Sequence, residues 1–444
     1  MRQKMSIDSE IENEDWLVVL PEEKELAAPD WSEIRRDTNL KGDLNDTLRQ
    51  KIQGLSCVKP LSNLTKDTCS FVDSILNTPV LEKNVLAPAL NSLYEQKAQF
   101  YQSLNIPKPL RTRQYICGSG LILSPDHCVT TIRDSLRVGL FLKGVDAALK
   151  QLAEENFGEP LHIVYPACGP FAPLLLPLLT YYKNQGIYSP DEINVTFIDI
   201  QEGAAIALDA LVKQLGLQEY VRKICCMEAC EYQVANDVHM VILEAMQHGF
   251  SREGHLRLAK HFADLLHPNG IFLPQNIAVT ASLSSAQREY VDQWKTDDMS
   301  VHGKIRNERI ELGKVLEVNL EFLRAMQEQV IDEHTRIVEC STLSIPYLEP
   351  AEDEKTLLFH TRVNVFGEDW LGEYESGITH PLPDSQVCVN FIPHDLRPGD
   401  LLVGSGDSLT FYYCMNGLPG FLTTKSDHSG GDRETILVEN GNGN

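Results

Sequence analysis

Residues 161–182 read LHIVYPACGPFAPLLLPLLTYY, and this stretch decides the fold. The apolar run at 161–165 predicts a short strand, and a loop at 166–170 leads into an apolar helix. Strands that alternate with helices form right-handed βαβ units, so the downstream pattern predicts an α/β fold with a largely parallel sheet. The further strands are expected at 195–200, 221–226, 238–243 and 271–273, and the further helices at 203–215 and 252–266.

Regions with a different texture flank this core. The N-terminal region is polar and has apolar residues at helical spacing, for example over 86–104. After the core, a charged helical stretch precedes short runs divided by Pro and Gly, which are typical of a small antiparallel barrel or sandwich. The tail is rich in Gly, Asn and Ser and predicts disorder. The expected order is a helical N-terminal region (1–115), a Rossmann-like domain (116–283), a helical insertion or arm (284–334), a β-barrel-like domain (335–425) and the tail (426–444).

Composition limits the partners. The chain has 444 residues, of which 43% are hydrophobic, so it is long enough for more than one buried core. Its 63 acidic and 39 basic residues give a formal net charge of −24. Such a surface repels phosphate backbones, which argues against nucleic acid, and it attracts cationic substrates or basic peptides. The acidity is equally explained by a simple contribution to solubility.

The cysteines and the apolar stretches indicate the compartment. The 11 cysteines are scattered and form no C-x-x-C pair, so we expect buried thiols in a reducing compartment and no metal site. The first residues show no apolar segment of the kind found in secretory signals. The longest apolar stretch, 171–182, is too short to cross a bilayer. We therefore expect a cytoplasmic protein without a membrane partner.

The first strand-to-helix loop contains Ala167, Cys168 and Gly169. Ligands of open α/β sheets bind beyond the carboxyl ends of the strands, and Gly169 lets a ligand approach the backbone. Asp199, at the end of the next strand, is placed to accept hydrogen bonds from ribose hydroxyls. This pattern suits adenosine ligands such as NAD or S-adenosylmethionine (SAM), and the missing G-x-G-x-x-G disfavours a dinucleotide. A purely structural turn followed by a solvated Asp explains the same residues.

Three carboxylates follow the next strands. Glu228 comes after the third strand, where it can reach an adenine edge or an ordered water. Glu244 ends the fourth strand, and Glu253 comes nine positions later across one loop. A convergent pair of carboxylates prefers a planar cation that donates two hydrogen bonds, which describes a guanidinium; without a cation, repulsion raises one pKa. The alternative for Glu253 is an acid that stabilises a helix N-terminus.

Residues 241–279 read VILEAMQHGFSREGHLRLAKHFADLLHPNGIFLPQNIAV and resemble the double-glutamate loop, helix and following strand of the protein arginine methyltransferases. In that family two glutamates nine apart hold the substrate guanidinium, and a Pro-x-Gly turn precedes a strand that ends in Pro. The matching residues, in order, are Glu244, Glu253, Pro268, Gly270 and Pro274. The resemblance covers roughly 130–415. Cys168 departs from the family's glycine-rich run, and Pro381 follows His380 where the family's Thr-His-Trp loop has Trp.

The resemblance implies that SAM is the cofactor. SAM would contact the loop of Ala167, Cys168 and Gly169, with Asp199 at the ribose and Glu228 near the adenine. Arg133 and Arg137 lie one helical turn apart, a spacing suited to pairing with the methionine carboxylate of SAM. The alternative for both arginines is a solvated helix face.

The resemblance also implies an arginine-containing protein or peptide as methyl acceptor, held by Glu244 and Glu253. His380 would orient a carboxylate or receive a proton, although a lone histidine is more often structural. In the family a helical arm mediates dimerisation, and residues 288–329 occupy the position of such an arm. The resemblance therefore implies a possible homodimer. An ordinary packed insertion explains these residues equally. Two other functions stay open: methylation of a small guanidino or amino metabolite, and a non-catalytic scaffold with the same fold.

Overall fold

The computed structural model describes residues 63–155, 157–234, 238–295, 299–348, 355–389 and 399–426. The chain divides into two compact units, Met1–Leu64 and Thr65–Asn444, and nearly all of the described residues belong to the second. The sequence predictions for most of the first unit and for the tail beyond 426 lie outside the described residues. No helix in the described ranges is long and apolar enough to cross a membrane.

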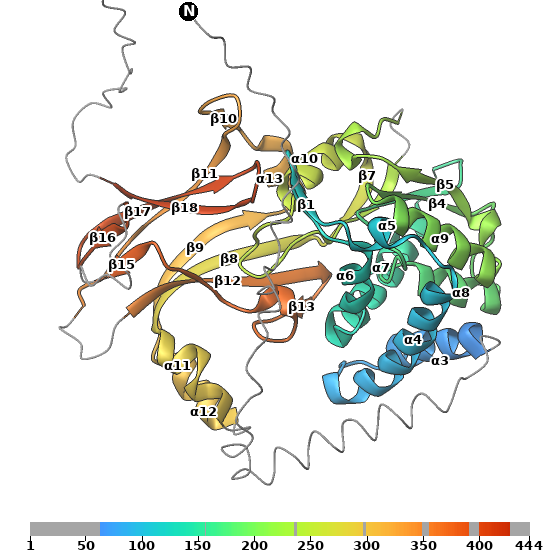
Figure 1. Cartoon of the computed structure of the whole chain (residues 1–444), viewed down its shortest axis with the longest axis horizontal. Coiled ribbons are helices and arrows are strands. Elements are labelled where there is room, and N and C mark those ends of the chain that lie inside the picture. The colour runs from blue at the N-terminus through green and yellow to red at the C-terminus, as the bar shows by residue number, and fades with distance from the viewer. Residues whose placement is uncertain are drawn as a thin grey trace, which may run out of the picture. The chain divides into compact units, whose positions relative to one another are not determined.

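Five parallel strands form the central sheet in the order β5-β4-β3-β6-β7. Figure 1 labels β4, β5 and β7 of this sheet. Every residue of β3 and β6 is buried, which is typical of parallel strands covered on both faces. The chain order reverses between β3 and β6, and ligands of such sheets bind at this point. The predicted α/β fold with a parallel sheet is therefore confirmed. The strands are β3 (Leu161–Pro166), β4 (Ile193–Asp199), β5 (Val221–Cys226), β6 (Val238–Ile242) and β7 (Leu266–Leu273).

Helices connect these strands. Gly186 and Gly216 end α8 and α9 in the left-handed conformation that favours glycine at helix C-termini. The helix expected from 171 begins only at Leu176, because the positive φ of Ala172 (39°) interrupts the turn before it. The helices are α7 (Ser135–Glu154), α8 (Leu176–Gln185), α9 (Glu202–Leu215) and α10 (His255–Leu265).

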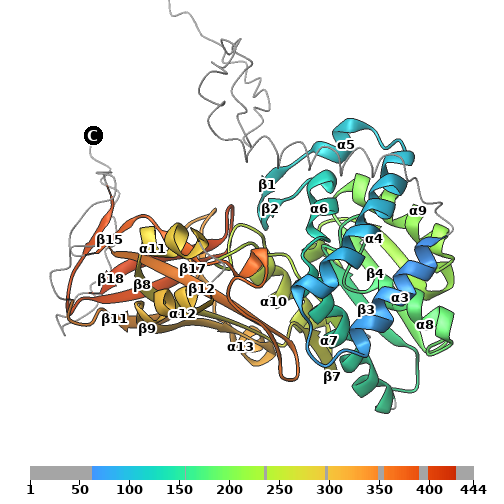
Figure 2. The same cartoon turned by 90° about the horizontal axis from the view of Figure 1, so that it is seen from below.

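The described N-terminal residues are largely helical, as predicted. The long helix α4 (Lys83–Ser103) lies alongside α7 (Figure 2). Pro88 is expected in the first turn of this helix but lies inside it, so one backbone hydrogen bond is missing there. The other elements before α7 are α3 (Leu64–Leu76), α5 (Lys108–Thr112), the hairpin β1 (Tyr115–Cys117) and β2 (Gly120–Ile122), and α6 (Pro125–Thr131).

The C-terminal half contains two antiparallel sheets. One has the order β13-β12-β8-β9, with β14 also paired to β12, and the other has the order β10-β11-β17-β18. A short parallel pair, β15 and β16, lies outside both. The strands are β8 (Asn276–Ser285), β9 (Ile310–Val318), β10 (Gln329–Val330), β11 (Arg336–Ser344), β12 (Lys355–Phe366), β13 (Asp369–Leu371), β14 (Leu382–Asp384), β15 (Val387–Val389), β16 (Leu401–Val403), β17 (Ser408–Cys414) and β18 (Gly420–Ser426).

The structure corrects two sequence predictions for this half. Strand β8 pairs with β12 over its whole length, so the antiparallel part begins at 276 and the boundary expected at 283 is too late. The stretch 284–334 was expected to be helical, and it does hold α11 (Ala286–Tyr290), α12 (Met299–Asn307) and α13 (Leu320–Ala325). It also holds β9 and β10. The β9 sequence IELGKVLEV has its charged residues at every third position and shows no strict alternation, so its periodicity does not predict a strand.

Candidate active site

A cavity of about 370 Å³ opens where the chain order of the parallel sheet reverses. Its walls come from the loop after β3, the loop after β6, the segment joining α6 to α7, and the antiparallel half. The residues that line this cavity include Asp134, Arg137, Ala167, Cys168, Gly169, Glu244, Gln247, His248, Glu253, Gly377 and Ile378. The structure thus brings together most of the residues that the sequence singled out.

A smaller cavity of about 90 Å³ lies beside the first. Asp199 and Glu228 line it, together with residues of the β1–β2 hairpin. Cys128, Ala167 and Glu253 line both cavities, so the two are adjacent compartments of one site at the carboxyl edge of the sheet.

The loop after β3 is held by the predicted aspartate. Ala167 and Gly169 both have positive φ (51° and 65°), and Cys168 between them is buried. The backbone N–H of Gly169 donates to Asp199 Oδ2 and that of Gln201 to Oδ1, both at 2.8 Å. Burial raises the pKa of Asp199 to about 6, against the effect of these two hydrogen bonds. Each carboxylate oxygen keeps a lone pair for a hydroxyl of a ligand.

Glu228 is fixed by the hairpin that precedes α6. The hydroxyl of Ser119 donates to Glu228 Oε2 at 3.2 Å. The same hairpin packs against Gly254, the residue after Glu253. The contact is so close that a Cβ on Gly254 would clash with the carbonyl oxygen of Ser119, so only glycine fits there. The sequence signal for this contact is the run Gly118–Ser119–Gly120, which by itself indicates only a turn.

The short loop between Glu244 and Glu253 is held in one conformation by backbone contacts. Gln247 and Ser251 form an isolated antiparallel bridge across it, and Phe250 and Arg252 both have positive φ. The backbone N–H of Arg252 donates to the carbonyl of Pro419, which belongs to the antiparallel half. Both halves of the molecule therefore fix the position of the glutamates.

Glu244 and Glu253 both line the larger cavity, half-buried and close enough for their charges to interact. Glu244 forms an ion pair with Arg137. Burial raises the pKa of Glu244, although Arg137 opposes this shift. Burial and the neighbouring Glu244 raise the pKa of Glu253 to about 8, so Glu253 is mostly protonated at neutral pH when no cation is bound. The mutual repulsion expected from the sequence is thus present in the structure.

Arg137 has a more complex position than the sequence indicated. Its side chain is 7% exposed, its Nη2 donates to the carbonyl of Thr131 at 2.7 Å, and its Nε lies 3.7 Å from Asp134. It lines the cavity beside Gly169, where a ligand carboxylate can reach it, while also pairing with Glu244. Arg133 is exposed, and its guanidinium stacks on Tyr94 at 4.1 Å; it does not line the cavity.

His380 is not in the wall of the cavity. It is exposed and stacks on Trp294, with 6.4 Å between ring centroids. Gly377 and Ile378 of the same loop line the cavity instead. His248 also lines it, and its pKa is lowered by burial, by Arg252 and by His380. Sequence reasoning missed His248 because a loop histidine carries no periodic signal.

Asp134 is a second residue that sequence reasoning missed. Its Oδ2 accepts hydrogen bonds from the hydroxyl of Ser376 and from the backbone N–H of Gly377, the latter at 3.1 Å. Asp134 precedes Arg137 by three residues, a spacing that places both on one side of a helix start. This spacing was the only local signal available.

Charge is unbalanced in this site. Five carboxylates line its two compartments, against one arginine, so the site favours a cationic ligand. No group of three or more His, Cys, Asp or Glu side chains suited to a metal occurs among the described residues. The five acids are Asp134, Asp199, Glu228, Glu244 and Glu253.

No family model and no curated protein matches the chain. Solved structures that are similar to it include the protein arginine methyltransferase 10 of Arabidopsis thaliana, at 13% identity and a TM-score of 0.41, covering 68% of this chain and 97% of that one. They also include a complex of the Trypanosoma brucei PRMT1 enzyme and prozyme with S-adenosylhomocysteine, at 14% identity and a TM-score of 0.36, covering 68% and 94%.

Proposed function

We propose that the chain is a SAM-dependent methyltransferase that acts on the guanidinium group of arginine in a protein or peptide. One observation carries the proposal: Glu244 and Glu253 line the same cavity close to each other, and its one arginine, Arg137, forms an ion pair with only one of them. At neutral pH a bound cation would favour the ionised form of Glu253, and a planar guanidinium can engage both carboxylates at once.

The smaller compartment and the β3 loop suit the cofactor. Asp199 has carboxylate lone pairs free for ribose hydroxyls, and Glu228 lines the same compartment. Gly169 leaves backbone accessible, and Arg137 can meet the methionine carboxylate. When bound, SAM supplies an electrophilic methyl group on a sulfonium.

The residues of the chain would then bind and orient the acceptor. Glu244 and Glu253 hold the plane of the guanidinium and concentrate its charge on the nitrogens they contact, which leaves the remaining nitrogen free to attack. Glu253 must lose its proton as the cation binds, because its pKa lies near 8 in the empty site. The walls of the cavity and the bound acceptor would together exclude water from the reacting groups. His380 lies outside the wall, so we assign it no contact with the acceptor.

A small guanidino metabolite is the second candidate acceptor. The larger cavity, at about 370 Å³, falls within the range of small-molecule sites, and Gly377 and Ile378 narrow it from the antiparallel side. Both candidate acceptors present a guanidinium group to the two glutamates. They differ in whether that group belongs to an arginine of a peptide chain or to a small molecule. The homodimer and the cytoplasmic location remain predictions of the sequence.

Calorimetry with SAM and S-adenosylhomocysteine tests the cofactor first. We expect saturable binding of both, and an absence of binding in the folded protein would favour the non-catalytic scaffold. Mass spectrometry would then follow methyl transfer to arginine peptides and to free guanidino compounds, with the matched lysine peptides as controls. Transfer to lysine peptides alone would contradict the guanidinium assignment.

A further inference from the structure

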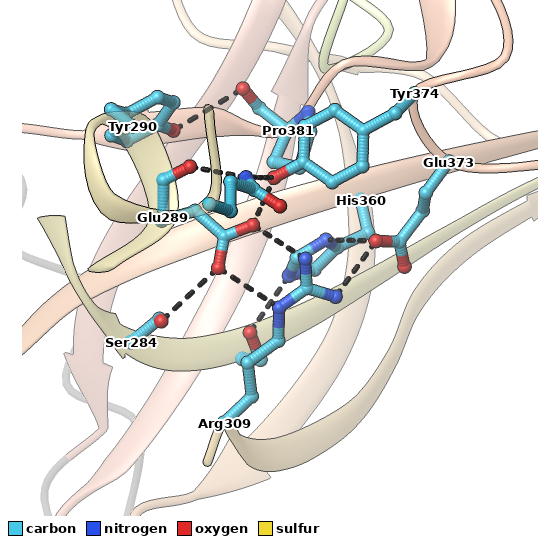
Figure 3. Close-up of polar contacts among 10 residues, drawn as sticks. Ser284, Glu289, Tyr290, Arg309, His360, Glu373, Tyr374 and Pro381 are labelled. Atoms are coloured by element: carbon cyan, nitrogen blue, oxygen red, sulfur yellow. Dashed lines mark hydrogen bonds and ion pairs between the residues drawn. The ribbon is translucent and has the colours of Figure 1, made fainter. Parts of the chain in front are cut away.

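A second cluster of charged side chains, largely buried, lies in the antiparallel half (Figure 3), and none of its three members lines either cavity. Arg309 donates from Nε and Nη2 to Glu289, at 3.0 and 2.5 Å, and from Nη1 to Glu373 at 2.7 Å. Glu289 is fully buried, and the Arg309 side chain is 3% exposed. The three residues come from α11, from the end of the connection into β9, and from the segment after β13.

Further contacts surround this cluster. The hydroxyl of Tyr374 donates to Glu289, and Gln293 donates to the Tyr374 hydroxyl at 2.9 Å. His360 Nδ1 lies 3.4 Å from Glu373. Burial opposes the ionisation of Glu373, but His360 and Arg309 outweigh it and lower its pKa to about 2. The adjacent residues Glu373 and Tyr374 are thus each tied to the cluster (Figure 3).

The segment that begins at these two residues leads directly to the cavity. We call residues 372–380 the anchor loop. Within it, the backbone N–H of Tyr374 donates to the carbonyl of Thr379 at 3.3 Å, and a reciprocal pair of hydrogen bonds between Ser376 and Thr379 closes a single tight turn. At the tip of this turn, Ser376 and Gly377 both donate to Asp134.

Asp134 connects the anchor loop to the acceptor site. It lies 3.7 Å from Nε of Arg137, and Arg137 pairs with Glu244. A path therefore runs from the ion pair of Arg309 and Glu373 along the backbone of the anchor loop, and then through the polar contacts of Asp134 and Arg137 to Glu244.

We infer that Glu373 and Arg309 are positioning residues for the acceptor site. Their ion pair fixes the base of the anchor loop, so that Ser376 and Gly377 hold Asp134, which in turn holds Arg137 against Glu244. Neither residue lines the cavity, so they act only through this loop. The effect on acceptor binding rests on the proposed function, whereas the link from Glu373 to Asp134 does not.

The test compares Glu373→Gln with a matched control, Glu375→Gln. Glu375 lies in the same loop and is exposed, and it accepts a hydrogen bond from the N–H of Gly372 that a glutamine oxygen also accepts. Amide hydrogen exchange at Gly377, measured without an acceptor, reports the bond to Asp134 directly. We expect about tenfold faster exchange at Gly377 in Glu373→Gln and no change in Glu375→Gln. Unchanged exchange in Glu373→Gln would overturn the inference, whatever the protein's activity.

The second measurement is calorimetry of N-acetyl-arginine amide binding to protein saturated with S-adenosylhomocysteine. We expect Glu373→Gln to weaken binding of this probe about tenfold without changing S-adenosylhomocysteine affinity, and Glu375→Gln to change neither. A merely stabilising cluster would alter thermal stability but leave the probe affinity intact. If the wild-type protein does not bind the probe at all, the proposed function fails and the exchange experiment still decides the link.

A double-substitution cycle locates the path. Ser376→Ala removes one of the two donors to Asp134. If Glu373 acts through the loop, the combined Glu373→Gln and Ser376→Ala protein should bind the probe no more weakly than the worse single variant. Fully additive losses would overturn the proposed path. Tyr374→Phe, which removes the hydroxyl that donates to Glu289 and accepts from Gln293, replaces Glu373→Gln in all three measurements if that variant does not fold.

Discussion

Two buried clusters in this protein have the same composition, two glutamates and one arginine, and opposite electrostatics. In the cavity, the arginine contacts one glutamate and a backbone carbonyl; in the antiparallel half, it contacts both glutamates. The pKa values of both glutamates are raised in the first cluster and lowered in the second. The clusters are Glu244, Glu253 and Arg137, and Glu289, Glu373 and Arg309.

The comparison shows how a shared cation distinguishes a structural cluster from a binding site. Burial alone raises the pKa of any carboxylate, and burial is the largest cause of the shift in Glu253. Glu373 is also desolvated, yet its nearby positive partners hold its pKa at about 2. The second cluster is complete, and the first lacks one cation, which a guanidinium ligand would supply.

Substitutions of the two glutamates in the cavity should cause the greatest loss of methyl-transfer activity. Glu244→Gln or Glu253→Gln keeps the shape of the site but removes a charge that orients the guanidinium, so kcat/KM for methyl transfer should fall by roughly 10²-fold or more. S-adenosylhomocysteine binding should stay nearly intact. Mass spectrometry of the methylated acceptor and calorimetry measure the two quantities. If both glutamine variants kept full activity, the guanidinium assignment would be wrong.

The arginines of the two clusters should differ in how much they contribute to the free energy of unfolding. Arg309→Met leaves Glu289 and Glu373 buried without their shared cation, which should lower the free energy of unfolding by about 3–5 kcal/mol. Arg137→Met should cost less, because Glu244 already has a raised pKa and takes up a proton more easily. Urea unfolding at neutral pH measures both. An equal or larger loss for Arg137→Met would contradict the difference between the clusters.

The pH dependence of acceptor binding follows from Glu253. Its pKa is about 8 in the empty site, so below pH 8 a proton must leave before the guanidinium binds. Affinity for N-acetyl-arginine amide should therefore fall about tenfold for each pH unit below 8 and level off above it. Calorimetry in two buffers of different ionisation enthalpy should detect the released proton.

Glu253→Gln supplies the control for this pH dependence. The variant should bind the probe weakly at every pH and release no proton. It should also change stability in a defined direction. Because the folded-state pKa of Glu253 lies above its ordinary value of 4.5, its contribution to stability is present at low pH and is lost as pH rises through 8. The ligand-free variant should therefore unfold at a higher temperature than the wild-type protein at pH 9, and the reverse order would contradict the raised pKa.

Much of the half of the molecule that holds the parallel sheet follows from local sequence patterns. The alternation of short apolar runs with helices predicts the parallel sheet, and the residue at each strand end predicts where Asp199, Glu228 and Glu244 lie. These predictions succeed because the carboxyl ends of parallel strands share one edge, so position in the sequence alone fixes position in the site.

The contacts that complete the site do not follow from such patterns. Ser376 reaches Asp134 across 242 residues of sequence, and neither residue belongs to a recognisable motif. The Arg309 cluster draws its members from separate elements of the antiparallel half, where the sequence pattern does not predict β8 and β9 correctly. His380 was predicted from a loop motif, but the tight turn before it places Gly377 and Ile378 in the cavity wall instead. Tertiary packing, not local propensity, determines all of these positions.

The pKa of Asp199, about 6, lies between those of Glu253 in the first cluster and Glu373 in the second. Its carboxylate is buried without a cation, but two backbone N–H groups keep its pKa near 6 instead of the higher value of Glu253. Asp199 should therefore be mostly ionised at pH 7 and able to accept ribose hydroxyls. Asp199→Ala should weaken SAM binding by about 1–3 kcal/mol. Glu202→Gln, an exposed acid three residues later, is the control and should have no effect; unchanged SAM affinity in a folded Asp199→Ala protein would refute the ribose assignment.

The smallest expected effect concerns the surface, where charges are screened, in contrast to both buried clusters. The net charge of −24 should draw a basic acceptor towards the cavity, and salt weakens this attraction as the Debye length shrinks from about 30 Å at 0.01 M to about 3 Å at 1 M. The proposed pairing of the guanidinium with Glu244 and Glu253 would lie inside the cavity and would be screened much less. Rising salt should thus lower kcat/KM for an arginine peptide several-fold while kcat at saturating acceptor changes little. A peptide of the same length with acidic residues around the arginine is the control, and its kcat/KM should rise or stay constant. If salt lowered kcat and kcat/KM equally for both peptides, the ions would be acting on the buried pair itself, and the distinction between steering and binding would fail.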